Sequence, residues 1–193
     1  MLKREMYKIL IAGEGGQGIQ SMAHILAKAA YESGLNVSYL PNYGVEQRGG
    51  VSLGFIQFGK GPIGFPKFAK ADLLVVLCDR AIERTKPYVQ KETLYLYDTD
   101  LISSINLAEI RAEKLPIPAT SVASAKLEPK VFNIVLLGAI TAELGIINIK
   151  MVEKALTENF ADKYILKPQL KNLNLKALDL GQRLAQEGYK NDK

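Results

Sequence analysis

Cysteine is nearly absent from this chain of 193 residues, which contains only Cys78. A single thiol cannot form an internal disulfide, and by itself it cannot hold an iron–sulfur cluster or a structural zinc ion. We therefore predict no metal site in this chain. Such low cysteine use fits a reducing compartment, and the N-terminus shows no signal-peptide cleavage pattern, so we expect a cytoplasmic protein.

Long hydrophobic runs are also missing. The most apolar stretch, residues 131–142, is interrupted by Asn133 and Thr141 and is shorter than the roughly 20 residues that a membrane span needs. We interpret it as a buried helix and expect no membrane partner. The net charge of +5 is a mild excess of 25 basic over 20 acidic residues, without a nucleic-acid recognition motif. It favours an anionic ligand or an acidic partner over nucleic acid.

The rest of the composition is that of an ordinary globular protein, with 48% hydrophobic and 23% charged residues. Domains average roughly 150 residues, so one domain is expected. Apolar runs of strand length alternate with helical patterns. The expected strands are 7–12, 36–40, 51–58, 73–77, 93–97 and an edge segment at 114–119, and the expected helices are 19–33, 79–88, 130–145, 150–160 and 170–188.

This order of elements predicts an α/β fold. We expect a three-layer α/β/α Rossmann-like domain with a mainly parallel or mixed sheet and a C-terminal helical arm. The first strand, glycine turn, helix and second strand are typical of the start of a right-handed βαβ unit. We place the domain core at residues 1–150 and a helical extension of the same domain at residues 151–193.

A glycine-rich turn at residues 13–18 separates the first strand from the first helix. Its glycines match the G-x-G-x-x-G spacing, and unpaired N–H groups at a helix start can receive a phosphate. Dinucleotide binding also needs an acidic residue at the end of the second strand, but residues 37–42 contain none, and Glu14 would place a negative charge beside the phosphates. Two interpretations stay open: an anion-accepting turn, or glycines that only let strand and helix pack closely.

The loop at residues 43–50 is the second informative stretch. It combines Glu46 and Arg48 with three glycines. An arginine fork can hold a phosphate or a partner's carboxylate through two hydrogen bonds. From the residues alone, the alternative is an internal pair between Glu46 and Arg48 or a solvated loop.

Together these stretches resemble one family. The sequences G-E-G-G-Q-G-I at 13–19 and Y-G-V-E-Q-R-G-G at 43–50 are similar to the G-x-G-G-Q-G and Y-G-P-E-x-R-G-G motifs of the gamma subunit, or gamma domain, of the 2-oxoacid:ferredoxin oxidoreductases. The apolar helix at 130–139 resembles a later segment of that family. Val45 stands where the family usually has proline, so the restricted φ of proline is missing there.

The resemblance implies a complex that oxidatively decarboxylates a 2-oxoacid such as pyruvate, forms an acyl-coenzyme A and reduces ferredoxin. It implies thiamine diphosphate and iron–sulfur clusters on partner subunits, not on this chain. The implied partners are the alpha, beta and ferredoxin-like subunits, with a homodimer as a further option, and the choice of 2-oxoacid depends largely on partner chains. This chain is expected to supply no catalytic residue and to be inactive alone.

By residue-wise carry-over, the resemblance also implies cofactor-binding positions, with coenzyme A as a ligand that they could contact directly. These positions are Gly15, Gly16, Gln17 and Gly18 in the first turn and Tyr43, Glu46, Arg48, Gly49 and Gly50 in the second. We expect the two turns to lie side by side at the edge where the parallel strands end. The alternatives are a stand-alone nucleotide- or phosphometabolite-binding module without enzymatic activity, and a homo-oligomeric scaffold.

Other polar residues are expected to have structural roles. His24 is assigned to a helix surface and Cys78 to the core. Asp72 and Asp79 flank one strand and are interpreted as turn and capping residues rather than a metal pair. Asn133, in an apolar helix, needs a hydrogen-bond partner if buried, and an adjacent loop is the natural one.

Overall fold

The computed structural model describes the backbone of residues 4–43 and 50–191 and the side chains up to residue 187. In this part of the chain six strands form one mixed sheet in the order β2-β3-β1-β4-β5-β6. The strands are β1 (Met6–Glu14), β2 (Asn36–Asn42), β3 (Val51–Gly59), β4 (Leu73–Val76), β5 (Leu94–Asp98) and β6 (Glu113–Ile117). Strands β1, β4, β5 and β6 are parallel to one another. The predicted α/β fold and mixed sheet are therefore confirmed.

The β2–β3 hairpin modifies the expected βαβ unit. Strand β3 is antiparallel to both β1 and β2, so β1 and β2 run in the same direction, as predicted, but are separated by β3. The sequence pattern did not show this insertion, because a buried strand has the same apolar composition at either place in a sheet. Register places Val51, the first residue of β3, opposite Glu14, the last residue of β1.

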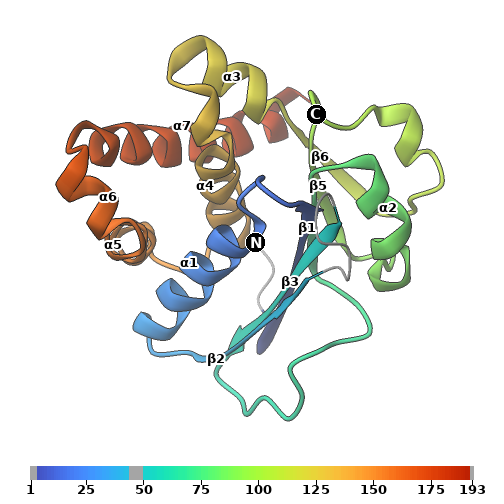
Figure 1. Cartoon of the computed structure of the whole chain (residues 1–193). Coiled ribbons are helices and arrows are strands. Elements are labelled where there is room, and N and C mark those ends of the chain that lie inside the picture. Colours follow the sequence, from blue (N-terminus) through green and yellow to red (C-terminus); the bar gives the residue numbers. More distant parts are fainter. Residues whose placement is uncertain (1–3, 44–49, 192–193) are drawn as a thin grey trace.

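Helices cover one face of the sheet, and Figure 1 shows α1 and α4 to α7 together on this side. They are α1 (Ile19–Glu32), α3 (Ala119–Lys126), α4 (Phe132–Leu144), α5 (Ile149–Asn159), α6 (Ala161–Leu166) and α7 (Gln169–Asn191), with the 3-10 helix η3 (Pro129–Val131) before α4. Ile9 and Ile11 of β1 point into this layer. On this face the helices predicted at 19–33, 130–145, 150–160 and 170–188 are confirmed as α1, α4, α5 and α7. Helices α3 and α6 were missed because each has fewer than three turns of apolar periodicity to detect.

The opposite face is covered by α2 (Asp79–Thr85), the 3-10 helices η1 (Lys86–Tyr88) and η2 (Ser104–Leu107), and irregular chain. Leu10 and Ala12 of β1 point into this second layer. Phe55, Phe68 and Tyr88 meet edge to face there, with ring centroids 5.4 to 6.4 Å apart. Because both faces of β1 are buried, its run of apolar residues is continuous rather than alternating.

The crossing of α4 and α7 is held by two glycines. A Cβ atom added to Gly138 would overlap the backbone of Leu178, and one added to Gly181 would overlap the backbone of Val135. The two helices therefore approach as closely as their backbones permit. The predicted boundary between a core and a helical extension at residue 150 stays a prediction.

Both edge strands contain a proline, Pro41 in β2 and Pro116 in β6. Proline has no N–H to donate, so these edges are poor templates for pairing with another strand. The prediction that 114–119 forms a proline-bearing edge segment is confirmed for β6. Over the described residues, we find no helix with the length and apolar character needed to cross a bilayer.

Candidate functional site at the carboxyl edge of the parallel strands

The glycine turn lies at the topological switch point of the sheet. It connects the end of β1 to α1 on one face, while the neighbouring strand β4 leads into α2 on the other face. Open α/β sheets bind ligands in the crevice outside the carboxyl ends of their strands at this point. The position predicted for the first turn is therefore one where ligand binding is physically favoured.

The glycines of the turn fall into two groups. A Cβ at Gly13 would lie 2.5 Å from Gln17 Oε1 and 2.7 Å from the side chain of Ile19, so Gly13 permits close packing. Gly15 and Gly16, in contrast, have no atom within 4 Å of an added Cβ, and Gly16 has a φ of 96° that favours glycine. Close packing therefore accounts for Gly13, and the anion-accepting interpretation stays a prediction for Gly15 and Gly16.

Gln17 joins the ends of β1 and β4. Its Nε2 donates to the carbonyl oxygen of Leu77 at 2.8 Å, and its Oε1 accepts from the backbone N–H of Glu14 at 2.7 Å. This side chain therefore bridges the ends of the two strands. This arrangement gives Gln17 a role in positioning the turn, and its predicted contact with a cofactor stays a prediction.

Glu14, at the end of β1, is paired with Arg80 at the start of α2. Its Oε1 accepts from Nε and one Nη of Arg80, at 3.1 and 2.7 Å, and both side chains are substantially exposed. Arg80 lies in the first turn of α2. The pair offsets the negative charge of Glu14 beside the glycine turn, which the sequence alone presented as an obstacle to phosphate binding.

The start of α4 meets the start of α1 at Gly18. Gly18 has a φ of 80°, and a Cβ there would overlap the side-chain amide of Asn133 in the first turn of α4. Neither helix has a side-chain cap or an acidic residue in its first turn. The uncapped positive end of α1 therefore lies beside the first turn of α4, where η3 precedes α4 and the N–H of Phe132 donates to the carbonyl of Pro129.

The half-buried amide of Asn133 faces the loop that the sequence analysis expected as its partner. It contacts Gly18, but no hydrogen bond joins it to any residue for which side chains are described. The expectation was right about the neighbouring loop, whereas a hydrogen bond that satisfies this amide is not found in the described part of the chain. Its Nδ2 lies beside Gly18, at the same edge as the glycine turn.

The ends of the second loop emerge beside the first turn. Tyr43 follows β2 and is 68% exposed, and Gly50 is half-buried just before Val51, the partner of Glu14 in register. Glu46, Arg48 and Gly49 lie outside the described residues, as does Val45. The expected adjacency of the two turns therefore has support from the ends of the second loop, and the binding roles stay predictions.

Gln20 anchors this hairpin to α1 and was missed by the sequence analysis. Its Nε2 donates to Ser52 Oγ at 2.7 Å and to the carbonyl of Leu53 at 3.1 Å, while its Oε1 accepts from the Tyr39 hydroxyl at 2.7 Å. Burial, and then the nearby Tyr43, raise the pKa of Tyr39. A glutamine on an otherwise amphipathic helix gave no sequence signal for this role.

Asp98 is a second residue that was missed. It is fully buried at the end of β5, where Oδ2 accepts from the backbone N–H and hydroxyl of Thr120, and Oδ1 accepts from the N–H of Asp100. Burial raises the pKa of Asp98 despite these donors. The carboxylate thus fastens the start of α3 to the sheet, and an acidic residue directly after an apolar strand was the available signal.

The remaining polar residues have the structural roles expected, with one correction. His24 is exposed, and Cys78 is buried, which raises the pKa of its thiol. Asp72 is held by Arg4 and the Lys8 N–H at the other end of β4 from Asp79. The interpretation of Asp79 as the cap of α2 is wrong: Cys78 is the N-cap residue, and Asp79 accepts from the Asn106 side chain at 2.9 Å.

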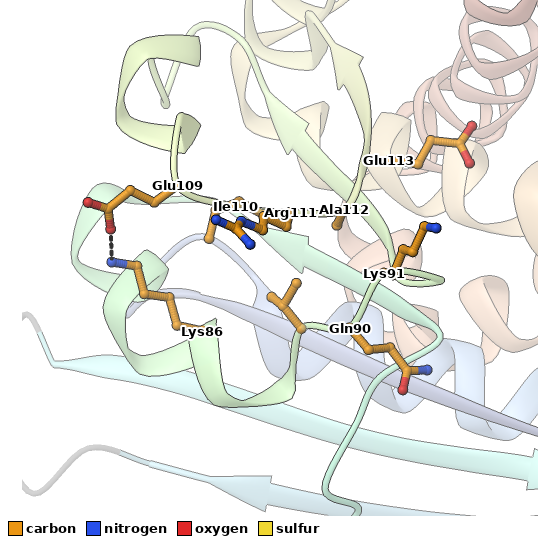
Figure 2. A pocket seen from close by; sticks show the side chains of 9 residues that line it. Lys86, Gln90, Lys91, Glu109, Ile110, Arg111, Ala112 and Glu113 are labelled. Carbon is orange, nitrogen blue, oxygen red and sulfur yellow. Dashed lines mark hydrogen bonds and ion pairs between the residues drawn. The ribbon is translucent and has the colours of Figure 1, made fainter.

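A wide pocket lies away from this edge, where the chain enters β5 and β6. It has a volume of about 830 Å³ and is lined by residues of two segments, 86–91 and 109–113 (Figure 2). None of the predicted cofactor-binding residues lines it. The pocket and the glycine turn are therefore separate sites at opposite ends of the parallel strands.

Comparison with known sequences covers nearly the whole chain. Residues 8–184 match the family described as pyruvate ferredoxin/flavodoxin oxidoreductase. The 2-oxoglutarate synthase subunit KorC of Methanocaldococcus jannaschii is 36% identical over 155 residues, which are 79% of this chain and 82% of the relative. The ketoisovalerate oxidoreductase subunit VorA of Methanothermobacter thermautotrophicus is 30% identical over 96% of this chain but only 38% of its own length.

Comparison with solved structures finds oxidoreductases of the same kind as the sequence relatives. The gamma subunit of a keto/oxoacid ferredoxin oxidoreductase from Geobacter sulfurreducens has a TM-score of 0.78 at 26% identity, covering 94% of this chain and 99% of that one. A 2-oxoglutarate:ferredoxin oxidoreductase from Magnetococcus marinus, with 2-oxoglutarate, coenzyme A and succinyl-CoA bound, has a TM-score of 0.83 at 26% identity. This chain covers 32% of that longer protein, and 96% of this chain is matched.

Proposed function

Since this chain belongs to the pyruvate ferredoxin/flavodoxin oxidoreductase family, as a gamma subunit of a 2-oxoacid:ferredoxin oxidoreductase complex, we propose that its glycine-turn edge forms the coenzyme A side of a shared catalytic centre. The observation that carries this proposal is the open space at Gly15 and Gly16 beside the uncapped start of α1, where the side-chain amide of Asn133 also lies. The complex oxidatively decarboxylates a 2-oxoacid to an acyl-coenzyme A and reduces ferredoxin.

The residues present at this edge fit a phosphate-bearing ligand. The first N–H groups of α1 are donors, and the positive end of this helix favours an anion beside the Asn133 amide. Arg80 offsets the one carboxylate at the turn, Glu14. Coenzyme A supplies the thiol that takes the acyl group, and this chain would bind and orient its phosphates through Gly15, Gly16 and the Asn133 amide.

Gln17 and Gln20 are also proposed to position the site. Gln17 holds the glycine turn on the two strand ends, and Gln20 holds the hairpin that carries the second loop. The family motif residues of that loop, Tyr43, Glu46, Arg48, Gly49 and Gly50, are proposed to face the neighbouring subunits and the same ligand. The exposed ring of Tyr43 supports this for the described end of the loop.

The reacting groups are proposed to come from the other subunits. One cysteine cannot hold an iron–sulfur cluster, so the clusters and thiamine diphosphate are assigned to alpha, beta and ferredoxin-like partners. We place the complex in the cytoplasm because of the low cysteine use. The family match over residues 8–184 favours this function over a stand-alone nucleotide- or phosphometabolite-binding module.

A matched pair of substitutions at Gly15 tests the coenzyme A contact. Gly15 has open surroundings, so Gly15→Ala and Gly15→Asp should both fold and assemble, but only the second adds a negative charge. Like charges about 4 Å apart in water repel by about 1 kcal/mol, so Gly15→Asp should raise the KM for coenzyme A by about fivefold over Gly15→Ala. The measurement is coenzyme A-dependent oxidation of the 2-oxoacid by the complex reconstituted with each variant.

The outcomes separate the two parts of the proposal. Equal KM values for coenzyme A in the two variants would refute the phosphate contact while leaving the subunit in its complex. A rise in KM for the 2-oxoacid with no change for coenzyme A would assign the edge to the other substrate. Failure of the wild-type chain to purify with partner subunits that carry thiamine diphosphate or iron–sulfur clusters would refute the proposed assembly.

A further inference from the structure

The pocket at the amino-terminal ends of β5 and β6 is not used by the function proposed above. It is bounded on one side by the chain that follows α2 and on the other by the chain that enters β6. Figure 2 shows Lys86 and Glu109 joined at one end, Lys91 near Glu113 at the other, and Arg111 between them. Its most exposed lining residues, Lys91, Glu109, Arg111 and Glu113, show that it opens broadly to solvent.

The cations of this pocket differ in what they already bind. Lys86 Nζ lies 2.5 Å from Glu83 and 2.9 Å from Glu109, and these contacts raise the pKa of Lys86, while Lys86 lowers that of Glu109. Lys91 and Arg111 form no ion pair with any residue whose side chain is described. Two cations therefore remain to receive a ligand, and they line the same pocket as the buried side chain of Ile110.

Both walls of the pocket are held in place by lysines outside its lining. Lys70 Nζ donates to the carbonyls of Pro87 and Val89 at 2.9 and 2.8 Å, and Lys114 Nζ donates to the carbonyl of Ile110 at 2.9 Å. These bonds fix the backbone on each side. They also place the positive charges of Lys70 and Lys114 beside the two walls of the pocket.

The lining indicates the chemistry of an occupant. A guanidinium fork and an ammonium group bind carboxylates, and Val89, Ile110 and Ala112 add apolar contact. Glu113 and Glu109 make a uniformly anionic ligand unfavourable, so apolar or neutral groups must separate its acids. The volume of about 830 Å³ and the broad opening suit a length of peptide better than one enclosed metabolite.

We propose that this pocket docks an acidic, partly apolar peptide segment of a partner protein, with a carboxylate on Arg111 and Lys91 and an apolar side chain against Ile110. Charge complementarity supports an acidic protein partner, because Lys86, Lys91 and Arg111 line the pocket against Glu109 and Glu113. The pocket lies at the opposite end of the parallel strands from the glycine turn. Docking there would leave that edge free for the catalytic complex.

The test uses the full-length chain and a fluorescein-labelled peptide of sequence Glu-Leu-Glu-Glu-Leu-Glu, titrated at one fixed ionic strength. Removing one charge-assisted contact by Arg111→Gln or Lys91→Gln should weaken binding by about tenfold. Lys126→Gln removes the same charge from the exposed end of α3 and serves as the matched control. Because the three side chains are exposed, circular dichroism should show the wild-type fold for each variant.

Each outcome has a defined meaning. The proposal would be supported if Arg111→Gln and Lys91→Gln bind the peptide more weakly than wild type while Lys126→Gln binds it with wild-type affinity. The wild-type chain should also fail to bind a control peptide in which every Glu is replaced by Gln. Equal losses in all three variants would show attraction by net charge alone and overturn it, as would absence of binding to the wild-type chain. Full competition by free succinate at the concentration of the peptide would also overturn it, because the site would then recognise a small dicarboxylate. These results are independent of the coenzyme A test, since Gly15 lies at the other edge.

Discussion

The crossing of α4 and α7 and the turn between β1 and α1 both depend on glycine, but in opposite ways. At the crossing, added Cβ atoms at Gly138 and Gly181 would overlap the backbone of the facing helix. At the turn, Gly15 and Gly16 have no atom within 4 Å of an added Cβ. The crossing uses glycine to bring two helices together, whereas these two positions of the turn leave space unfilled.

This difference separates stability from ligand binding. A closely packed crossing contributes dispersion contacts and excludes water, so its glycines should be required for folding. Open space beside the uncapped start of α1 contributes nothing to packing, and the ligand proposed above would account for it. Gly181→Ala and Gly15→Ala test this division as the largest and the smallest expected loss of stability, with Gln17→Ala and Asp98→Asn between them.

Gly181→Ala should destabilise the chain most. Its Cβ would overlap the carbonyl of Val135 and lie 3.0 Å from the Ala139 nitrogen, so α4 and α7 must separate. Overpacking of this kind costs about 3 kcal/mol, which exceeds the gain of about 1 kcal/mol from replacing a helical glycine with alanine. Urea unfolding measures the loss, with Gly64→Ala, which has open surroundings, as the control. Equal stability of the two variants would contradict the packing role.

Gln17→Ala should come second. It removes the hydrogen bonds to the Glu14 N–H and the Leu77 carbonyl and leaves both backbone groups partly buried. The expected loss is about 2 kcal/mol in the free energy of unfolding. Gln169→Ala, at the exposed start of α7, should change little by the same measurement. If the two glutamines prove equivalent, Gln17 does not join the strand ends and is available for a ligand.

Asp98→Asn should change how stability depends on pH. Burial raises the pKa of Asp98 above its ordinary value of 3.8, so the folded chain holds this proton more tightly than the unfolded chain. The contribution of Asp98 is therefore fully present below pH 3.8 and is lost as the pH rises through the folded pKa. Thermal unfolding of wild type and Asp98→Asn should be measured below pH 3.8 and again above the folded pKa of Asp98. Wild type should lose stability relative to the variant as the pH rises between these two points. A constant difference would contradict the assignment.

Gly15→Ala should have the smallest effect on stability. With nothing within 4 Å of its Cβ, the free energy of unfolding should stay within about 0.5 kcal/mol of wild type. Gly16→Ala is the informative companion, because Gly16 has equally open surroundings but a φ of 96°. Left-handed backbone costs a non-glycine residue about 1 to 2 kcal/mol, so denaturant unfolding should rank Gly16→Ala below Gly15→Ala. The reverse order would contradict the turn geometry.

The sequence predicted the strands and the long helices because their apolar periods are strong. It missed α3 and α6, which contain eight and six residues, and it did not place β3 between β1 and β2. Nor did it identify Gln20 or Asp98, since their roles depend on partners 19 to 33 positions away in the chain. A local sequence pattern does not show which distant residues will contact one another.

The motifs at 13–19 and 43–50 sufficed to identify the family and to place the first turn between a strand and a helix, because glycine spacing and apolar runs are local properties of the chain. Only the tertiary structure decided that Gly13 and Gly18 pack while Gly15 and Gly16 stay open, that Arg80 pairs with Glu14, and that α4 begins against the glycine turn. The reason is physical. Segments far away in the sequence determine which atoms fill the space around a residue. These segments come together only when the sheet and its two helical layers assemble.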